Sequence, residues 1–373
     1  MENAALADDS AQTAGDTSIG GIPIRNLWLL MLYASDLFRM QGNKMIAAEE
    51  DPDEIPDLVA EILAHLVTKR LERNLTFGYR NRHEVLNRVR GRIDFLTTER
   101  HQLLARGTIA CRFEDLTVDT PRNRFVLAAL TAVADIVSRP DLSHNCRVLA
   151  SRLKRLGVAG GKPTGKEIET ERYGHHDAED RVMVTAAKLA LDLALPTEAG
   201  GTQYLVSPNR DSITLWLLFQ KAVYGFYDVV LSVQGWRVQS GRWLNWLIDD
   251  ETPGIREILP SMQTDIVLDY PATDRRIVID TKFSKITTTG RYRKESLQSG
   301  HIYQMYSYLR SQEGTGDIAA ETAAGLLLHP SVGKMVNETV VIQGHALRFA
   351  TVDLGAKTSE IRQQLLKVVD FKV

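Results

Sequence analysis

Cysteines, long apolar runs and surplus basic charge are all scarce in this chain. Its two cysteines, Cys111 and Cys146, form no C-x-x-C pair, which argues against both a disulfide framework and a structural zinc site. The longest apolar run covers residues 27–34, far short of the ~20 residues of a membrane span. The formal net charge of −2 argues against a basic protein that coats nucleic acid. We therefore expect a protein of the cytoplasm that does not contact a membrane.

The N-terminus also lacks a secretory signal. Its residues are acidic and small, with no basic region followed by an apolar one, so we expect residues 1–21 to form a disordered tail. The whole chain has 373 residues, of which 44% are hydrophobic and 25% charged. That composition is typical of a globular protein, and the length exceeds what one ordinary core accommodates. We therefore expect two domains.

The first predicted domain, residues 22–206, is a mixed helix and strand (α+β) domain. Apolar residues spaced by three and four predict helices at about 22–39, 58–71, 122–137, 144–156 and 178–195. Between residues 69 and 106 the chain is rich in arginine, and turn residues there predict short strands. This stretch can bind DNA or an acidic surface of a partner protein, and the residues alone leave both interpretations open. Ser207-Pro208-Asn209 predicts a hinge.

The second predicted domain, residues 207–373, is an α/β domain with a mixed sheet flanked by helices. Helices are expected at about 213–227, 295–310 and 357–369. Strands are expected near 235–240, 262–270, 276–283, 323–329, 338–343 and 346–353.

One pair of these strands carries the residues of greatest chemical interest. The turn residues Pro271-Ala272-Thr273-Asp274 predict a hairpin between the strands on either side. Side-chain alternation puts Asp280 and Lys282 on one face, and Asp265 on the neighbouring strand comes opposite that face. The run Ile277-Val278-Ile279 is apolar on both faces, which indicates a strand inside the sheet. Charged groups are costly there unless they have a function.

Two carboxylates and one ammonium group suit metal-assisted phosphodiester hydrolysis. Carboxylate oxygens bind Mg²⁺, or Mn²⁺ in its place, and the ion lowers the pKa of a bound water and stabilises charge on the phosphate. Asp265 and Asp280 are the candidate metal ligands, and Lys282 is the candidate group that positions or activates the attacking water. A lone Asp-x-Lys on a strand is more often a surface ion pair, so the interpretation depends on burial of the strand.

The predicted helix after the hairpin adds two candidate site residues. Gln304 and Tyr308 are four positions apart and therefore lie on one face of the helix. They can contact a DNA phosphate or brace Lys282. The alternative is that they are half-buried helix residues with solvated polar groups.

A glycine-rich segment in the first domain imitates a phosphate-binding loop. It reads Gly160-Gly161-Lys162-Pro163-Thr164-Gly165-Lys166-Glu167. Glu167 stands where Ser or Thr is needed for Mg²⁺, and Pro163 interrupts the backbone cradle. We expect a loop here and no nucleotide site in this chain.

The motifs, taken in order, resemble the McrC family, the nuclease components of McrBC-type modification-dependent restriction systems. The resemblance covers nearly the whole chain from Ile22. It rests on Ile22-Pro23-Ile24-Arg25-Asn26, Arg90-Gly91-Arg92-Ile93-Asp94-Phe95, Pro121-Arg122-Asn123-Arg124, Leu218-Phe219-Gln220-Lys221, Asp265 with Asp280-Thr281-Lys282, and Gln304 with Tyr308.

The resemblance implies a PD-(D/E)xK restriction-endonuclease-like fold for the C-terminal domain, with Asp265, Asp280 and Lys282 as metal ligands and catalytic lysine. It also implies that the N-terminal half binds and stimulates a hexameric McrB-like AAA+ GTPase, which reads methylcytosine in double-stranded DNA. Many nucleases of this fold carry a Glu where this chain has Gln220, so a third carboxylate ligand is not expected from the sequence.

Two further hypotheses compete with this one. In one, this chain is a non-catalytic activator that has a degenerate nuclease fold and assembles an NTPase complex. Gln220, which stands in place of a carboxylate, favours this hypothesis. A stand-alone nuclease without a motor is the other hypothesis.

Overall fold

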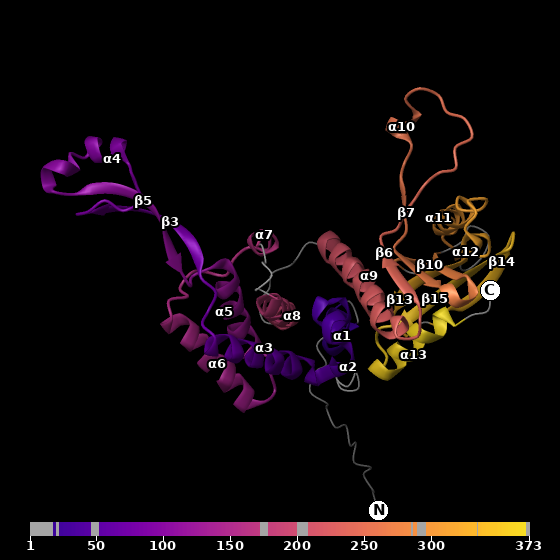
Figure 1. The fold of residues 1–373 in the computed structure, drawn as a ribbon. Helices are drawn as coiled ribbons and strands as arrows, with labels where there is room; N and C mark the ends of the chain where they lie inside the picture. Colours follow the sequence, from indigo (N-terminus) through magenta and orange to yellow (C-terminus); the bar gives the residue numbers. More distant parts are fainter. Residues whose placement is uncertain are drawn as a thin grey trace, which may run out of the picture. The chain divides into compact units, whose positions relative to one another are not determined.

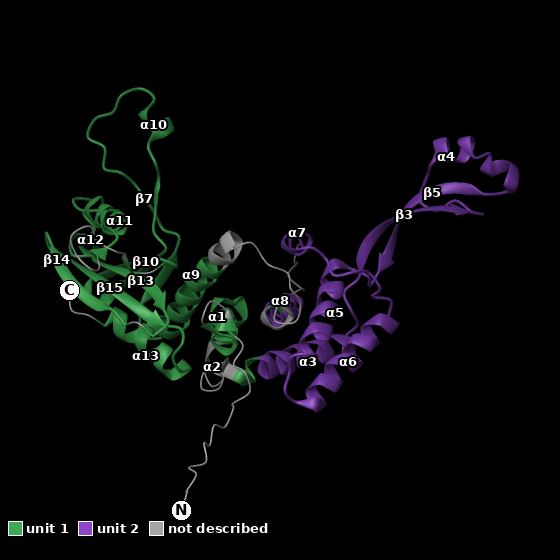
Figure 2. Cartoon of the chain, turned by 180° about the vertical axis from the view of Figure 1, so that it is seen from behind, with its two compact units in different colours: residues 1–55, 195–373 green, residues 56–194 purple. Residues whose placement is uncertain are grey.

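A computed structural model gives the fold of this protein (Figure 1) and describes residues 18–19, 22–45, 52–171, 178–199, 208–284, 286–288, 296–333 and 335–370. The chain divides into two compact units: unit 1 comprises residues 1–55 and 195–373, and unit 2 comprises residues 56–194 (Figure 2). Of the predicted tail, only Ser18–Ile19 (β1) is described, and it pairs with Ile22–Pro23 (β2). The rest of residues 1–21 lies outside the described part. None of the described helices combines the length and apolarity of a membrane span.

This division differs from the expected domains 22–206 and 207–373, because the first helices belong to unit 1. Helix α1 (Ile24–Ala34) packs against α9 (Pro208–Ser232), and the Tyr33 and Phe226 rings lie 5.1 Å apart. A Cβ on Gly225 would come within 2.0 Å of the Tyr33 carbonyl oxygen, so only glycine permits this close approach. The apolar face of α1 is therefore buried in unit 1, against a helix that is distant in the sequence.

The predicted hinge at 207–209 is also different in the structure. Ser207 lies outside the described residues, while Pro208 and Asn209 begin α9. Proline is favoured in the first turn of a helix because its missing N–H has no partner there in any case. The Ser-Pro-Asn sequence therefore starts a helix instead of ending a domain.

Unit 1 contains a six-stranded mixed sheet with the order β14-β15-β13-β10-β9-β6. The β10–β13 and β13–β15 pairs are parallel, whereas the β14–β15, β10–β9 and β9–β6 pairs are antiparallel. The strands are β6 (Arg237–Ser240), β9 (Ile266–Tyr270), β10 (Arg275–Thr281), β13 (Ala324–Ser331), β14 (Asn337–Ile342) and β15 (His345–Asp353). The prediction of a mixed α/β sheet is confirmed.

Helices flank this sheet on both faces. Figure 1 shows α11 (Ser299–Arg310) and α12 (Ile318–Glu321) on one side and α9 and α13 (Thr358–Val369) on the other. Met305 and Leu309 of α11 pack on Val278 and Leu327 of the sheet, and the Tyr227 hydroxyl of α9 donates to the Leu365 carbonyl of α13 at 2.8 Å. Strand β10 is buried on both faces, as its sequence predicted.

Shorter elements complete unit 1. They are α2 (Asp36–Met45), the 3-10 turns Pro52–Glu54 and Pro271–Thr273, β7 (Trp243–Leu244), α10 (Ile255–Ile258), β8 (Met262–Gln263), β11 (Thr287–Thr288) and β12 (Ser296–Leu297).

Unit 2 joins a helical base to a projecting β-ribbon. The helices are α3 (Ile55–Glu72), α4 (Phe95–Arg100), α5 (Pro121–Val133), α6 (Pro140–Arg155), α7 (Gly165–Glu169) and α8 (Ala178–Ala199), with a 3-10 turn at Leu103–Arg106. The strands β3 (Gly78–Leu86), β5 (Ile109–Thr117) and β4 (Arg92–Ile93) form the ribbon in that order. We call residues 78–117 the arm; Figure 1 shows it extending away from α5 and α6.

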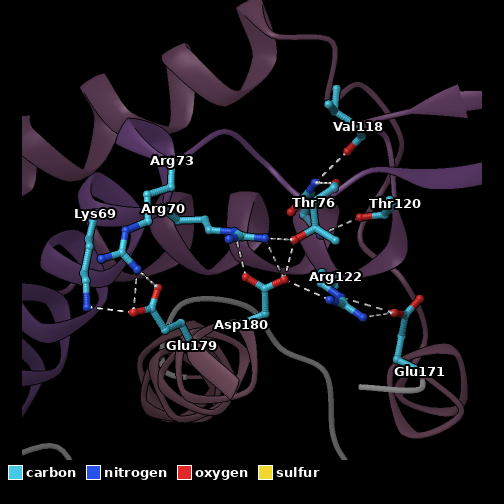
Figure 3. A network of polar contacts seen from close by, with 11 residues as sticks. Lys69, Arg70, Arg73, Thr76, Val118, Thr120, Arg122, Glu171, Glu179 and Asp180 are labelled. Carbon is cyan, nitrogen blue, oxygen red and sulfur yellow. Dashed lines mark hydrogen bonds and ion pairs between the residues drawn. The ribbon is translucent and has the colours of Figure 1, made fainter. Parts of the chain in front are cut away.

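A buried ionic network ties the arm's base to three helices (Figure 3). Asp180 of α8 is 1% exposed and pairs with Arg122 of α5 at 2.8 Å and with Arg70 of α3 at 2.8 Å. The hydroxyl of Thr76, two residues before the arm, also donates to Asp180. Because removing one partner of a buried pair leaves the other charge uncompensated, loss of any member of this network is expected to destabilise the junction between the arm's base and the helices.

Candidate functional site

The β9–β10 hairpin brings the two candidate metal ligands together. The antiparallel register pairs Ile279 with Ile266, so the next positions outward are Asp280 and Asp265. The turn between the strands is closed by Asp274, whose φ of 49° lies in the left-handed region that Asp and Asn tolerate better than most residues. Turn chemistry and strand register therefore place both carboxylates at one end of the hairpin.

Asp280 is the buried member of the pair. It is 2% exposed, and its Oδ2 lies 2.8 Å from Nζ of Lys282. Burial raises the pKa of Asp280 to about 6, the positive charge of Lys282 opposes that rise, and the charge of Asp265 adds to it. A carboxylate in such a place is costly to ionise without a cation beside it.

Asp265 is held by the strand that carries Asp280. Its Oδ2 accepts hydrogen bonds from the Thr281 backbone N–H at 2.7 Å and from the Thr281 hydroxyl at 2.8 Å. Thr281 is fully buried, and its carbonyl accepts the indole N–H of Trp216 from α9 at 3.1 Å. Sequence reasoning missed this role of Thr281, because alternation placed it on the face opposite Asp280. Its position between the two candidate motif residues was the available signal.

Gln304 and Tyr308 extend the cluster from α11. Nζ of Lys282 donates to Oε1 of Gln304 at 3.0 Å, and Nε2 of Gln304 donates to the Tyr308 hydroxyl at 2.6 Å. Burial raises the pKa of Tyr308, so its hydroxyl keeps its proton. The structure thus brings all five predicted site residues into one cluster: Asp265, Asp280, Lys282, Gln304 and Tyr308.

The cluster fits a hard divalent cation. Oδ2 of Asp280 is buried beside the Lys282 ammonium and accepts no well-aligned hydrogen bond from the described residues, so it retains a lone pair for a metal. The described residues contain no group of three or more His, Cys, Asp or Glu arranged around a metal. A cation here would therefore have two protein carboxylates and otherwise water or phosphate oxygens, which is the coordination that Mg²⁺ accepts. Gln220 lies one turn after Trp216 on α9 and supplies no third carboxylate.

Residues 160–164 of the glycine-rich segment form a loop between α6 and α7, as predicted, whereas Gly165, Lys166 and Glu167 begin α7. The backbone N–H groups of Ala159 and Gly160 donate to Oδ1 of Asp119 at 3.1 and 3.0 Å. A helix precedes the loop where a phosphate-binding loop follows a strand. These amides are therefore committed to a carboxylate of the chain itself.

The fold and the cluster define an α/β protein with two acids and a lysine gathered on a mixed sheet. The sequence matches the family described as McrBC 5-methylcytosine restriction system component over residues 6–205 and 234–330, more than half of its length. The chain belongs to this family, and the resemblance to McrC drawn from the ordered motifs is confirmed. It is 26% identical over 352 residues to the type IV methyl-directed restriction enzyme EcoKMcrBC of Escherichia coli (strain K12), across 94% of this chain and 97% of that protein.

Two solved structures from Thermococcus gammatolerans also align with the chain. One is a half-complex from a tetradecameric assembly of McrB AAA+ hexamers with bound McrC. The alignment covers 93% of this chain and 76% of that chain, with 16% identity and a TM-score of 0.41. The other is the McrBC complex, for which the alignment covers 50% of this chain and 61% of that chain, with 16% identity and a TM-score of 0.31.

Proposed function

We propose that this chain is the nuclease subunit of a McrBC-type restriction system and that it cuts modified, methylcytosine-containing double-stranded DNA by Mg²⁺-dependent hydrolysis. The observation that carries the proposal is that Asp265, Asp280 and Lys282 gather at one end of a buried hairpin, with Asp280 and Lys282 in an ion pair. Family membership alone does not specify which residues act, and this cluster supports assigning the chemistry to these three.

Each residue of the cluster has a separable task. Asp265, fixed by Thr281, and Asp280, whose Oδ2 lies beside the Lys282 ammonium and retains a lone pair, would hold the ion. The bound ion supplies charge stabilisation at the phosphate and a water of lowered pKa. Lys282 places its ammonium beside the attacking water and offsets negative charge that develops on the phosphate. Gln304 fixes that ammonium through its Oε1 atom, and Tyr308 fixes Gln304.

The second part of the proposal concerns the partner. The matched family is a component of the McrBC restriction system, and we propose that this chain binds and stimulates a hexameric McrB-like GTPase. The arm carries exposed apolar side chains, including Tyr79, Phe95, Leu96, Leu104 and Leu116. Apolar side chains contribute little to binding a phosphate backbone but much to a protein interface. We therefore favour the motor over DNA as the arm's partner.

A non-catalytic activator is the competing function. It is favoured by Gln220, which provides no carboxylate on α9. It is disfavoured by the full acid, acid and lysine cluster with its supporting Gln304 and Tyr308. Since a decayed site has no need to keep Asp280 buried beside Lys282, we regard catalysis as the better account.

Paired variants in the two units test the whole proposal. Asp280→Ala and Lys282→Ala should abolish DNA cleavage and leave stimulation of the partner's GTPase intact. Leu96→Asp on the arm, where the side chain is 85% exposed, should weaken GTPase stimulation without unfolding the protein. Asp274→Asn is the matched control, because it alters an acid of the same hairpin that lies in the turn.

The measurements are nicking of methylated duplex DNA, GTP hydrolysis and melting temperature. Cleavage that survives Asp280→Ala would support the non-catalytic hypothesis for this site. Loss of both activities in each folded variant would refute the assignment of separate tasks to the two units.

A further inference from the structure

Two imidazoles lie beside the cluster and have no task in the proposed function. His329 is on β13, the parallel neighbour of β10. The register pairs Asp280 with Leu327, and the Lys282 backbone N–H donates to the Leu328 carbonyl at 3.0 Å. Paired positions point to the same face of a sheet, so His329 lies alongside Lys282 on the face covered by α11.

His329 is fixed in one tautomer. It is 2% exposed, and its Nδ1 lies 2.8 Å from the Ser284 carbonyl oxygen. A carbonyl only accepts, so Nδ1 carries the proton and Nε2 does not. Burial lowers the pKa of His329 to about 4, and the ring therefore stays neutral at neutral pH.

His301 packs against this fixed ring. The two ring centroids are 5.8 Å apart with planes inclined by 40°. On α11, His301, Gln304 and Tyr308 are spaced by three and four, so they form one stripe. The other two members of that stripe belong to the cluster, which puts His301 at the cluster's edge. Burial and the nearby charge of Lys282 both lower the pKa of His301.

The His301 side chain makes no hydrogen bond within the described part of the chain, although its neighbours in the stripe are both hydrogen-bonded. A neutral imidazole has one N–H donor and one acceptor. Its position next to the ammonium of Lys282 favours an anionic acceptor, and the anion that reaches this face in a nuclease is the DNA backbone.

We propose that His301 donates its ring N–H to a phosphate oxygen of the DNA strand that is cut, and that His329 is the positioning residue that orients it. This inference rests on the proposed nuclease function. It adds a substrate contact from the first turn of α11, on the side of Lys282 away from Tyr308. Lys282 then has one neighbour, Gln304, that fixes it and another, His301, that shares the phosphate.

The test compares substitutions of His301 in the full chain, with the McrB-like partner and GTP present. His301→Ala should lower kcat/KM on methylated duplex DNA by about 10- to 100-fold, the cost of a lost hydrogen bond to a charged group. The change should fall mainly on KM and should also weaken DNA binding in EDTA, measured by fluorescence anisotropy. His301→Asn keeps an N–H donor and should recover most of the loss.

Two further variants separate contact from packing. Tyr303→Ala is the matched control on the same helix, because Tyr303 is 68% exposed and lies about 200° around the helix from His301; it should leave kcat/KM unchanged. His329→Leu should cost a similar factor alone and little more when combined with His301→Ala, because His329 acts through His301.

The outcomes are distinguishable from failure of the proposed function. If Asp280→Ala abolishes cleavage while His301→Ala cuts like the wild type, only this inference is overturned. If the wild-type chain does not cut DNA with its partner, both fail. An activity loss that follows melting temperature and is not rescued by His301→Asn would assign His301 a packing role and overturn the contact.

Discussion

The burial of Asp280 has a cost in stability that a single substitution should reveal. The pKa of Asp280 is raised from its ordinary 3.8 to about 6, and burial is the largest cause of the rise. Between these values the folded protein binds a proton that the unfolded chain has released. Unfolding free energy therefore falls as pH rises through this window, by up to about 3 kcal/mol above pH 6.

Asp280→Asn removes the ionisable group while keeping its size. In EDTA at pH 8 the variant should therefore be more stable than the wild type, by at most that same amount. The difference should shrink as pH falls towards 4, where the wild-type carboxyl is protonated when folded. The same variant should not cleave DNA, because the amide is a poor ligand for the ion.

Urea denaturation followed by fluorescence, repeated at several pH values, measures the difference. Mg²⁺ provides the internal control: it should stabilise the wild type, since a ligand that binds only the folded state raises stability, and should not stabilise Asp280→Asn. A variant that is less stable than the wild type at pH 8, or a difference that grows as pH falls, would refute the reasoning.

Two more predictions concern the supports of the two units. Asp180→Ala leaves Arg122 and Arg70 without their buried partner and should destabilise unit 2 by about 3–5 kcal/mol, seen as an earlier urea transition. Glu179→Ala, which removes the exposed pairs with Lys69 and Arg73, should change the urea transition far less. Gly225→Ala would put a methyl group 2.0 Å from the Tyr33 carbonyl and should separate α1 from α9, seen as faster proteolysis within residues 22–45; unchanged proteolysis would contradict the close packing.

The half of the chain that carries the six-stranded sheet was predictable because its signals are local. The apolar run at 277–279 indicated an interior strand, and the turn at 271–274 set the register that joins Asp265 to Asp280. Spacing of four along one helix was enough to associate Gln304 with Tyr308. Each of these inferences needs only a few neighbouring residues.

The differences arise where the partner is distant in the sequence. The apolar face of α1 indicated burial but not that it would pack against α9. Asp269, beside the turn, accepts hydrogen bonds from Arg276 and pairs with Arg242. The helix predicted from residue 295 begins at Ser299, because Ser296–Leu297 pairs instead with Thr287–Thr288. Local periodicity does not contain these pairings.

The interrupted sequence of unit 1 has a consequence for biosynthesis. Helix α1 leaves the ribosome early, yet its partner α9 follows the whole of unit 2, residues 56–194. At synthesis rates of about 5–20 residues per second, synthesis of unit 2 takes roughly 7–28 s. During that time the apolar face of α1 has no α9 to pack against. A chaperone at the exit tunnel could bind this face during that interval. A fragment that starts at residue 207 would lack α1, the helix against which α9 packs.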